Sequence, residues 1–492
     1  MVVRRAGGRN GRAMNENEQS KTVMDNIVSL CKRRGFIFQS SEIYGGLNGF
    51  WDYGPLGCEL KKNIRDSWWR DMVQKRENVV GLDSAIILHQ KVWEASGHVA
   101  GFSDPMVDCR ACKRRFKADQ LCEEQGKKLI RTPQGYKLPE GIICGACGSD
   151  RLTEPRGFNL MFKTYVGPVE DDSAVAYLRP ETAQGIFTQF ANVMATSRQK
   201  IPFGIAQIGK AFRNEINPKN FTFRSREFEQ MELEFFVKPG TDRQWHDYWV
   251  AERLKWYESI GLPRSSLNCY VYSRDELAHY ASACVDIQYA FPFGTQELEG
   301  IAARGDFDRS RHQKYSGKPL DYFDAETNEK YIPHVIEPSA GVDRIGLAVL
   351  CNAYREEWVP QEGTGGNVIE AVPGEKTPDG YDQRTVLRFH PAVAPIKVGV
   401  FPLLKNKPAL VAKARAVFDM LRKHWPCFYD EAGAIGRRYR RQDEAGTPFC
   451  VTIDFQTLEE DTVTIRERDS MLQTRVAIGK LDEEIAGRMG IA

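Results

Sequence analysis

A hairpin of two long strand-like segments constrains the fold of this chain most strongly. Residues 202–216 and 226–237 are both rich in strand-forming side chains, and the short turn NPKNFTF joins them. Strands joined by so short a turn pair antiparallel. Because successive side chains of a strand point to opposite faces, we expect Met231, Leu233 and Phe235 to pack inward from one face. The hairpin therefore predicts an antiparallel sheet in a mixed α+β fold.

The opposite face of this hairpin carries polar side chains in a fixed order. They are Arg213 and Glu215 of the first segment, and Arg224, Arg226, Phe228, Gln230, Glu232 and Glu234 of the second. Guanidinium groups bind phosphate oxygens, an aromatic ring stacks on a base, and carboxylates suit an ammonium group. The face could therefore hold ATP and an amino acid. A solvated sheet face with cross-strand ion pairs would show the same alternation, so the pattern alone leaves both interpretations open.

The length of the chain and a local change of composition predict more than one domain. At about 100 to 200 residues per domain, 492 residues correspond to two to four domains. Residues 361–383 combine glycine, proline and acidic residues without a sustained apolar period, which is typical of a boundary. We expect a disordered tail at 1–20, with Met14 as an alternative start, a catalytic unit at 21–390 and a second domain at 391–492.

The segments beyond this boundary alternate between strand-like and helix-like patterns. The expected strands are 396–404, 448–455 and 462–467, and the expected helices are 407–425 and 471–489. Such alternation predicts a small α/β domain.

Two of the cysteine pairs have the spacing of metal ligands. Cys109 and Cys112 form one CxxC unit, and Cys144 and Cys147 form another. Four thiolates in two such units are typical of a structural zinc site with no open coordination position. A redox dithiol or unpaired structural cysteines are the alternatives. We expect a zinc-binding insertion at about 105–155.

Charge and motif content exclude several classes of protein. Lys and Arg total 68 against 66 Asp and Glu, so nucleic acid would have to bind at local basic patches. The basic run 436–441 and the segment 464–470 are candidates, although such runs are usually solvated faces.

No stretch approaches the ~20 apolar residues of a membrane helix, and no secretory signal is apparent. P-loop, Rossmann and zincin motifs are absent, so a nucleotide would be held in another way.

Several segments resemble one enzyme family. One segment resembles motif 2 of the class II aminoacyl-tRNA synthetases: it consists of FRNE, a turn, and Arg224-x-x-x-Phe228-x-x-x-Glu232. Its sequence is most similar to that of the homodimeric glycyl enzymes. Residues 42–57 resemble motif 1, residues 179–187 a substrate loop, and residues 337–350 motif 3. Alone, Arg344 in motif 3 would read as an exposed charge at the start of a helix. The matches follow in the family's order along nearly the whole chain.

The resemblance implies a fold and an activity. The fold is a class II antiparallel-sheet catalytic domain with a zinc-ribbon-like insertion and a C-terminal α/β anticodon-binding domain. The activity is ATP-dependent attachment of glycine to tRNA(Gly) through glycyl-adenylate, which makes the chain a ligase of protein biosynthesis. A cytoplasmic homodimer without membrane attachment is also implied.

The resemblance also implies roles for individual residues. Arg213, Glu215, Arg224 and Arg344 are the expected catalytic residues, with Arg213 on the α-phosphate and Arg224 on the β- and γ-phosphates. Phe228 would stack on adenine opposite Arg344, Glu215 would bind the adenine amino group, and Glu297 would hold magnesium. Further ATP-binding residues are Asn214, Phe223, Leu298 and Gly341. The glycine-binding set is Glu181, Phe228, Gln230, Glu232, Glu337, Ser339 and Gly341.

Two regions carry additional expectations. Arg438, Arg466 and Arg468 are expected to contact tRNA. Lys117 stands where the family usually has an arginine, and lysine cannot form a bidentate fork, which puts that substrate contact in doubt.

Two other functions are alternatives to this enzyme. A catalytically silent class II synthetase-like accessory protein that binds nucleic acid would carry degenerate motif arginines, whereas Arg213, Arg224 and Arg344 are all present. A sister enzyme for another small amino acid is disfavoured by the glutamate-rich substrate segments.

Overall fold

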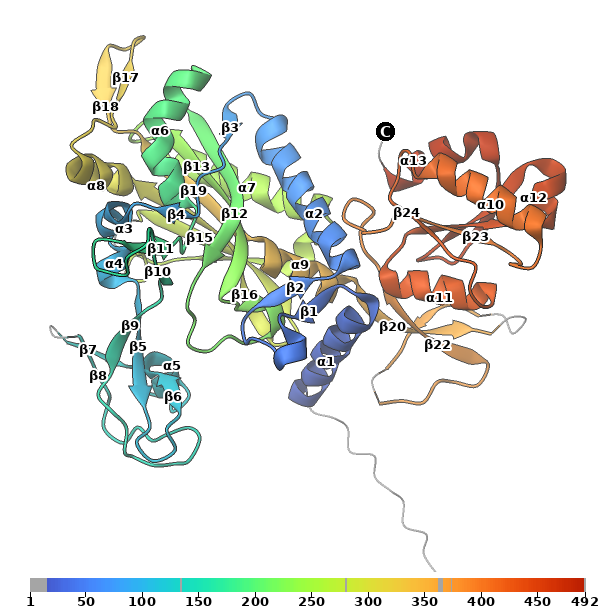
Figure 1. Ribbon diagram of the computed structural model, residues 1–492, viewed down its shortest axis with the longest axis horizontal. Helices are drawn as coiled ribbons and strands as arrows, with labels where there is room; N and C mark the ends of the chain where they lie inside the picture. The colour runs from blue at the N-terminus through green and yellow to red at the C-terminus, as the bar shows by residue number, and fades with distance from the viewer. Residues whose placement is uncertain (1–15, 133–134, 279–280, 362–365, 373, 491–492) are drawn as a thin grey trace, which may run out of the picture.

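The computed structural model describes residues 16–132, 135–278, 281–361, 366–372 and 374–490. Figure 1 shows a catalytic body, an insertion projecting from it, and a C-terminal part on the other side. The expected disordered tail is only partly testable. Residues 1–15 lie outside the described ranges, whereas residues 16–20 belong to helix α1 (Glu16–Arg34), so the prediction was wrong for them.

A seven-stranded sheet forms the centre of the catalytic body. Its order is β14-β15-β16-β19-β13-β12-β3. The strands are β3 (Val79–Gly81), β12 (Phe203–Phe212), β13 (Glu227–Val237), β14 (Leu267–Val271), β15 (Ala283–Phe291), β16 (Gly294–Gly305) and β19 (His334–Gly341). All neighbours pair antiparallel except β3, which runs parallel to β12 at the edge. The antiparallel sheet predicted from the hairpin is confirmed.

One face of this sheet packs on helices and forms the main core. Met231, Leu233 and Phe235 of β13 are buried there, as their alternation predicted. The helices packed on this core are α1, α2 (Pro55–Trp69), the π-helical turn η2 (Arg70–Gln74), α7 (Asp242–Ser259) and α9 (Val342–Ala353). The opposite side chains of β13 are therefore left to line a site.

A second group of helices covers another part of the sheet. Phe187 and Phe190 of α6 (Ala183–Ser197) pack with Phe203, Ile205 and Phe236. Beside α6 lie α8 (Phe307–Ser316) and α3 (Gln90–Ser96), which leads into α4 (His98–Gly101).

Small strands complete the catalytic body. They are β1 (Ile37–Gln39) with β2 (Trp51–Tyr53), β4 (Ile87–Leu88) with β11 (Val175–Leu178) and β10 (Lys163–Tyr165), and β17 (Tyr322–Asp324) with β18 (Glu329–Tyr331). The 3-10 turns are η1 (Glu42–Tyr44), η3 (Phe221–Phe223) and η4 (Arg264–Ser266).

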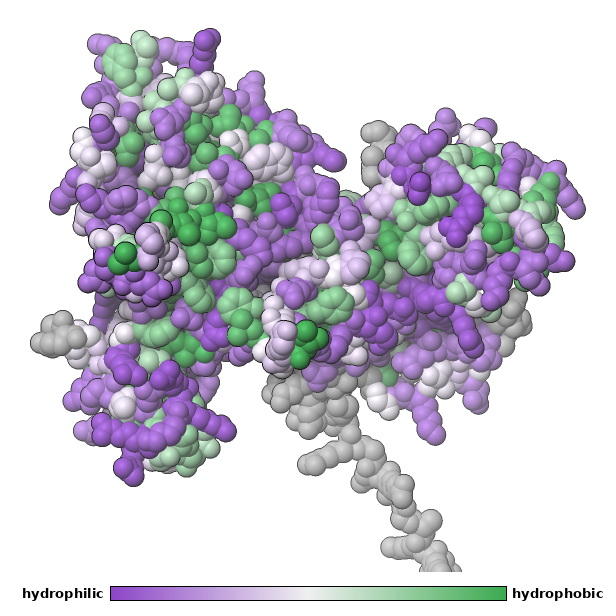
Figure 2. Space-filling model, viewed as in Figure 1, coloured by the Kyte–Doolittle hydropathy of each residue, from purple (hydrophilic) through white to green (hydrophobic). Residues whose placement is uncertain are grey.

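The insertion has its own small core. Val107, Leu121 and Ile142 are buried together in it. Its elements are β5 (Ser103–Asp108), β6 (Arg115–Lys117), α5 (Ala118–Glu123), β7 (Ile130–Thr132), β8 (Gly135–Lys137) and β9 (Arg156–Asn159). In the space-filling view the insertion stands out as a separate lobe, mostly hydrophilic on the visible face (Figure 2).

The predicted interdomain boundary is more structured than its composition suggested. Strands β20 (Tyr354–Pro360), β21 (Ile369–Glu370) and β22 (Tyr381–Leu387) form a three-stranded sheet there. The prediction missed β22 because its buried positions are not all apolar: Arg384 is buried and pairs with Glu357 of β20 at 2.9 Å.

The C-terminal part is a five-stranded sheet with helices. Its order is β24-β23-β25-β26-β27, with β26 and β27 antiparallel. The elements are β23 (Val398–Pro402), α10 (Pro408–Leu421), β24 (Cys427–Tyr429), α11 (Ile435–Ala445), β25 (Phe449–Ile453), α12 (Phe455–Glu460), β26 (Thr462–Glu467), β27 (Gln473–Ala477), η5 (Ile478–Lys480) and α13 (Leu481–Met489). The single helix predicted at 471–489 was wrong in its first half, because Val476 pairs opposite Val463 in the sheet.

Candidate active site

A cavity of about 330 Å³ opens on the polar face of the hairpin. Its walls come from β13, β15, β16, β19, the turn after β12 and the start of α9. This volume lies in the range of small-molecule sites. We call the part lined by Arg213, Arg224 and Arg344 the cationic end, and the part lined by Glu181, Glu232 and Glu337 the acidic end. Charges of the opposite sign also lie at each end, since Glu297 pairs with Arg344 and Arg304 pairs with Glu337. Together these groups suit a ligand that carries phosphates and an ammonium group.

Nearly all of the residues predicted for ATP and glycine line this one cavity. They are Glu181, Arg213, Glu215, Phe223, Arg224, Phe228, Gln230, Glu232, Glu297, Leu298, Glu337, Ser339, Gly341 and Arg344. Asn214 is not among the lining residues; its backbone N–H donates to the carbonyl of Leu160 at 2.7 Å. The hairpin pattern indicated Arg213, Glu215, Arg224, Phe228, Gln230 and Glu232, because every second residue of a strand shares one face. The family resemblance indicated the others.

The cationic end is built just outside the strands. The alternation had placed Arg213 and Glu215 on a strand. β12 ends at Phe212, so both residues lie in the turn that follows it. Arg213 Nε donates to the carbonyl of Pro180 at 3.0 Å, which fixes the direction of its guanidinium group. One oxygen of Glu215 is buried without a hydrogen-bond partner among the described residues. Such an acceptor is costly unless a donor fills it.

The aromatic rings of the site pair with guanidinium groups. Arg213 lies over Phe228, with its Cζ atom 5.2 Å from the ring centroid. Arg344 lies over Phe223, with its Cζ atom 4.5 Å from the ring centroid. The expected stacking of adenine between Phe228 and Arg344 stays a prediction. Phe223 lies beside the start of α9 because it belongs to the 3-10 turn η3, which packs against that helix. Both rings therefore border the cavity.

Glu232 is the most completely fixed carboxylate of the acidic end. It is buried, and one oxygen accepts hydrogen bonds from the backbone N–H of Thr182 at 3.1 Å and from its hydroxyl group. The other oxygen accepts from Ser339 Oγ at 2.8 Å. Hydrogen bonds to the ionised form stabilise a buried carboxylate. Glu232 can therefore present a fixed negative charge.

Glu181 is held by residues that the sequence did not indicate. His98 Nε2 lies 3.4 Å from its carboxylate, and Gln184 donates to it at 2.9 Å. Burial disfavours the charged form, but His98 and Arg304 outweigh it and hold the pKa of Glu181 below its ordinary value. His98 is oriented by Ser96, whose hydroxyl lies 2.8 Å from Nδ1.

Glu337 is paired with Arg304 of β16. The Nη1 atom of Arg304 lies 2.7 Å from Glu337, and its Nε atom lies 2.8 Å from Asp308 of α8. Burial raises the pKa of Glu337 to about 8, although Arg304 opposes the shift. Arg304 was missed because an isolated arginine in an apolar strand carries no motif.

Two further carboxylates lie at the cationic end. Arg344 pairs with Glu297 at 3.2 Å. A Cβ atom at Gly300 would lie 3.5 Å from an oxygen of Asp286 and 3.8 Å from one of Glu297, so both carboxylates reach the same space. Burial and the charge of Glu297 raise the pKa of Asp286 to about 6, while Tyr272 donates to it at 2.8 Å. Such oxygen donors fit a divalent cation.

A buried ionic cluster ties the elements of the site together. Lys61 of α2 pairs with Glu229 of β13 at 3.2 Å and with Asp343 of α9 at 2.9 Å. Asp343 also accepts from the backbone N–H of Glu229 at 2.7 Å. The cluster therefore fixes the start of α9, which carries Arg344, against the hairpin.

Lys117 lies outside the main cavity. Its ammonium group pairs with Asp104 at 2.6 Å. It lines a neighbouring groove of about 390 Å³ between the insertion and the hairpin turn, which also includes Lys219 and Arg224. The structure thus places Lys117 near Arg224 but engaged with the insertion itself.

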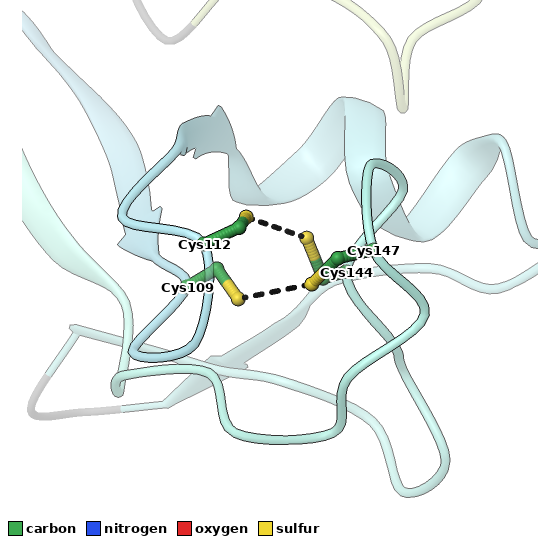
Figure 3. Close-up of side chains that lie close together, drawn as sticks. All are labelled: Cys109, Cys112, Cys144 and Cys147. Atoms are coloured by element: carbon green, nitrogen blue, oxygen red, sulfur yellow. Dashed lines mark hydrogen bonds between the residues drawn. The ribbon is translucent and has the colours of Figure 1, made fainter.

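The four predicted zinc ligands lie together in the insertion (Figure 3). Sγ of Cys109 is 3.7 Å from that of Cys147, and Sγ of Cys112 is 3.6 Å from that of Cys144. Four thiolates at about 2.3 Å from one zinc ion would lie roughly 3.8 Å apart. The arrangement therefore fits a tetrahedral zinc site and not two disulfides, whose sulfur atoms lie at about 2.05 Å.

The three arginines predicted to contact tRNA are inside the C-terminal domain. Arg438, Arg466 and Arg468 are all nearly buried, with exposed fractions of 2%, 5% and 3%. Arg438 donates to the carbonyls of Pro402 and Gly433, Arg466 pairs with Asp443, and Arg468 donates to the carbonyl of Gly446. The expectation of an exposed basic face is wrong for these residues, because buried guanidinium groups satisfied by the protein cannot reach a partner.

Comparison with known proteins identifies two matching families. Residues 166–354 match the family described as tRNA synthetase class II core domain (G, H, P, S and T), and residues 397–488 match the anticodon binding domain family. Within the described residues, every helix is too short or too polar to cross a bilayer.

Curated relatives match almost the whole chain. A glycine–tRNA ligase of Thermobifida fusca is 54% identical over 95% of this chain and 98% of its own length. A glycine–tRNA ligase of Treponema denticola is 53% identical over 93% of this chain and 95% of its own length. One of Streptomyces coelicolor is 51% identical over 95% and 98%.

Proposed function

Because this chain belongs to the glycine–tRNA ligase family of class II synthetases, we propose that it charges tRNA(Gly) with glycine in two steps at the cavity on the polar face of the hairpin. A carboxylate oxygen of glycine attacks the α-phosphorus of ATP, and pyrophosphate leaves. The 3′-terminal hydroxyl of tRNA then attacks the glycyl carbonyl, and AMP leaves. The meeting of Arg213, Arg224 and Arg344 with Glu181, Glu232 and Glu337 in one cavity is the observation that carries this proposal.

The nucleotide belongs at the cationic end. Arg213 would stabilise charge that develops on the α-phosphate, and Arg224 would hold the β- and γ-phosphates. Fixed guanidinium groups stabilise such charge without any proton-transfer residue. The unsatisfied oxygen of Glu215 would accept from the adenine amino group. The purine would lie among Phe228, Phe223 and Arg344, where it displaces the present ring contact of Arg344.

Glycine belongs at the acidic end. Glu181, Glu232 and Glu337 would surround its ammonium group, with Gln230 and Ser339 beside the Cα atom. Glycine has no side chain, so recognition depends on these charges, and larger amino acids are excluded by bulk where a Cβ would lie. Ser339 already fixes Glu232, which leaves little room for that side chain to adapt.

Two metals complete the proposal. Glu297 would hold magnesium, which neutralises phosphate charge when bound. The four cysteines would hold a structural zinc ion, because four thiolates leave no coordination position for water. The chain's own part is to position these donors around the cavity and the insertion.

We extend the proposal to domains, partners and location. Residues 21–390 would form the catalytic domain, with the zinc-binding insertion at about 105–155, and residues 391–492 would bind the anticodon of tRNA. A cytoplasmic homodimer would form through the segment that resembles motif 1. Ile43 and Tyr44 support this interface, because their exposed fractions are 88% and 87%. Large apolar side chains so exposed favour a partner surface.

The substrate assignment predicts a selective exchange reaction. With ATP and labelled pyrophosphate, glycine is expected to support exchange at least about a hundredfold better than alanine or serine, since a Cβ would meet the walls of the site. Exchange with every amino acid of a panel measures this directly. Equal exchange with alanine would remove the glycine assignment, and no exchange with any amino acid would favour the silent accessory protein.

The zinc assignment predicts a local loss of stability. Replacing Cys144 by serine is expected to release zinc, to unfold the insertion and to weaken the binding of ATP, because the insertion lines the groove beside Arg224. Metal content and limited proteolysis measure the first two effects. Cys58→Ser is the matched control, since Cys58 is exposed on α2 away from the cluster. An unchanged zinc content in the Cys144 variant would contradict the site.

A further inference from the structure

Glu234 lies two residues beyond Glu232 on the same face of β13, behind the residues that line the cavity. Its side chain is fully buried, and neither carboxylate oxygen has a hydrogen-bond partner among the described residues. An ionised carboxylate in such a place is costly, whereas a neutral carboxyl group is much less so.

The acids around Glu234 make its ionisation harder still. Oxygens of Glu232, Glu234 and Glu337 all lie within 4.8 Å of one another. Glu232 is stabilised by Thr182 and Ser339, and Glu337 by Arg304. Donors therefore offset part of the cost of burying Glu232 and Glu337. No donor from the described part of the chain reaches Glu234.

Two buried arginines, Arg304 and Arg309, act on Glu234 through their charge, but neither donates a hydrogen bond to it. Arg304 of β16 pairs with Glu337 and with Asp308 of α8, which adds a further negative charge. Arg309 of α8 is buried between Phe190 and Phe236, and forms no hydrogen bond with any described residue. Among the described residues, the empty site therefore offers Glu234 no hydrogen-bonded counter-charge.

We propose that Glu234 holds a proton while the glycine pocket is empty, and releases it to solvent when the ammonium group of glycine enters. The O–H bond of Glu234 breaks, its proton leaves, and the ammonium group takes the place of that proton as the positive charge of the cluster. Glu234 is thus a positioning residue: its proton lowers the net negative charge of the three buried carboxyl groups while the pocket is empty. This inference rests on the proposed function, since glycine must bind at this end.

The electrostatics agree with the geometry. Burial, followed by the charges of Glu337 and Glu232, raises the pKa of Glu234 well above its ordinary value, and Arg304 does not offset the shift. The empty site binds more protons than the occupied one, so glycine binding strengthens as pH rises through the neutral range. Release of one whole proton corresponds to an affinity increase of about tenfold per pH unit.

Proton release can be counted directly. Wild-type protein in weakly buffered solution near neutral pH, titrated with glycine in the presence of a pH indicator, is expected to release close to one proton per site filled. Glu234→Gln removes the titrating group with little change of shape. This variant is expected to release none, and its KM for glycine in pyrophosphate exchange is expected to lose its pH dependence.

A matched control lies on the same strand. Glu227→Gln changes a partly exposed carboxylate that pairs with Lys210 at the start of β13, and this variant is expected to release as many protons as wild type. If Glu234→Gln does not fold, Glu234→Met provides a second neutral variant, and the pH dependence of the wild-type KM still tests the release.

Three outcomes would overturn the inference. They are no proton release by the wild type, the same release by Glu234→Gln, and a wild-type KM for glycine that does not fall as pH rises. Each of them can occur while glycine-dependent exchange is intact, in which case only this inference fails. Loss of all glycine-dependent exchange in the wild type would instead remove the proposed function.

Discussion

Arg213→Ala is expected to reduce glycine-dependent pyrophosphate exchange by about 10²- to 10³-fold or more, with the fold intact. Arg213 lies over Phe228 at the cationic end of the cavity, and its Nε atom is fixed by the carbonyl of Pro180. A guanidinium group so oriented stabilises charge in the transition state, which alanine cannot replace. Because the loss concerns the transition state, kcat should fall more than the affinity for glycine changes.

Lys210→Ala is the matched control for this prediction. Lys210 lies on the same hairpin, three residues before Arg213, but is partly exposed and pairs with Glu227. It lines no part of the cavity. Exchange by this variant should stay close to wild type. If Arg213→Ala and Lys210→Ala exchange equally well, Arg213 has no part in adenylate formation.

Asp443→Ala is expected to destabilise the C-terminal domain by about 3–5 kcal/mol. Asp443 is fully buried on α11 and pairs with Arg384 of β22 at 2.9 Å and with Arg466 of β26 at 2.9 Å. Its removal leaves two buried guanidinium groups without their carboxylate. Urea unfolding followed by fluorescence or circular dichroism measures the shift of the corresponding transition.

An exposed acidic residue of the same domain provides the comparison. Asp419→Ala removes a carboxylate from α10 that pairs with Arg422, where both side chains have exposed fractions of 61%. Pairs of this kind contribute little, so a change within about 0.5 kcal/mol is expected. Equal stability of the two variants would mean that the buried cluster does not hold the domain together.

The position of Asp443 gives this prediction a second consequence. Arg384 and its partner Glu357 belong to the small sheet that follows the catalytic body, so Asp443 links the two parts of the chain. Loss of Asp443 is therefore expected to impair tRNA charging more than pyrophosphate exchange. The first reaction requires both parts to be held together, whereas the second uses the catalytic cavity alone.

Local periodicity and residue spacing predicted much of the fold and of the candidate site. The alternation in residues 226–237 predicted the inward face of β13 and the cavity-lining face together, because a strand has a strict period of two. The two CxxC units predicted a thiolate cluster, because two residues between cysteines set the sulfur separation. These features depend on neighbours in the chain, so the sequence alone contains them.

Long-range packing limited the other predictions. Strand β22 was not predicted, because Arg384 occupies one of its buried positions. The ion pair between Arg384 and Glu357 forms only when β20 and β22 meet in the folded chain. A basic run suggested an exposed surface, yet Arg438 turns inward to the carbonyls of Pro402 and Gly433. Whether a charge is solvated or buried depends on partners that are distant in sequence.

By itself, the sequence determined the antiparallel hairpin, the set of groups on its polar face and the paired cysteines, since each follows from the covalent order of side chains along a strand or loop. Only the tertiary structure decided which charges are paired, which are buried and which remain unsatisfied. Thr182 on Glu232, Arg304 on Glu337 and the unpartnered Glu234 are cases of this kind. The physical reason is that desolvation and ion pairing depend on distances between segments, which no local pattern specifies.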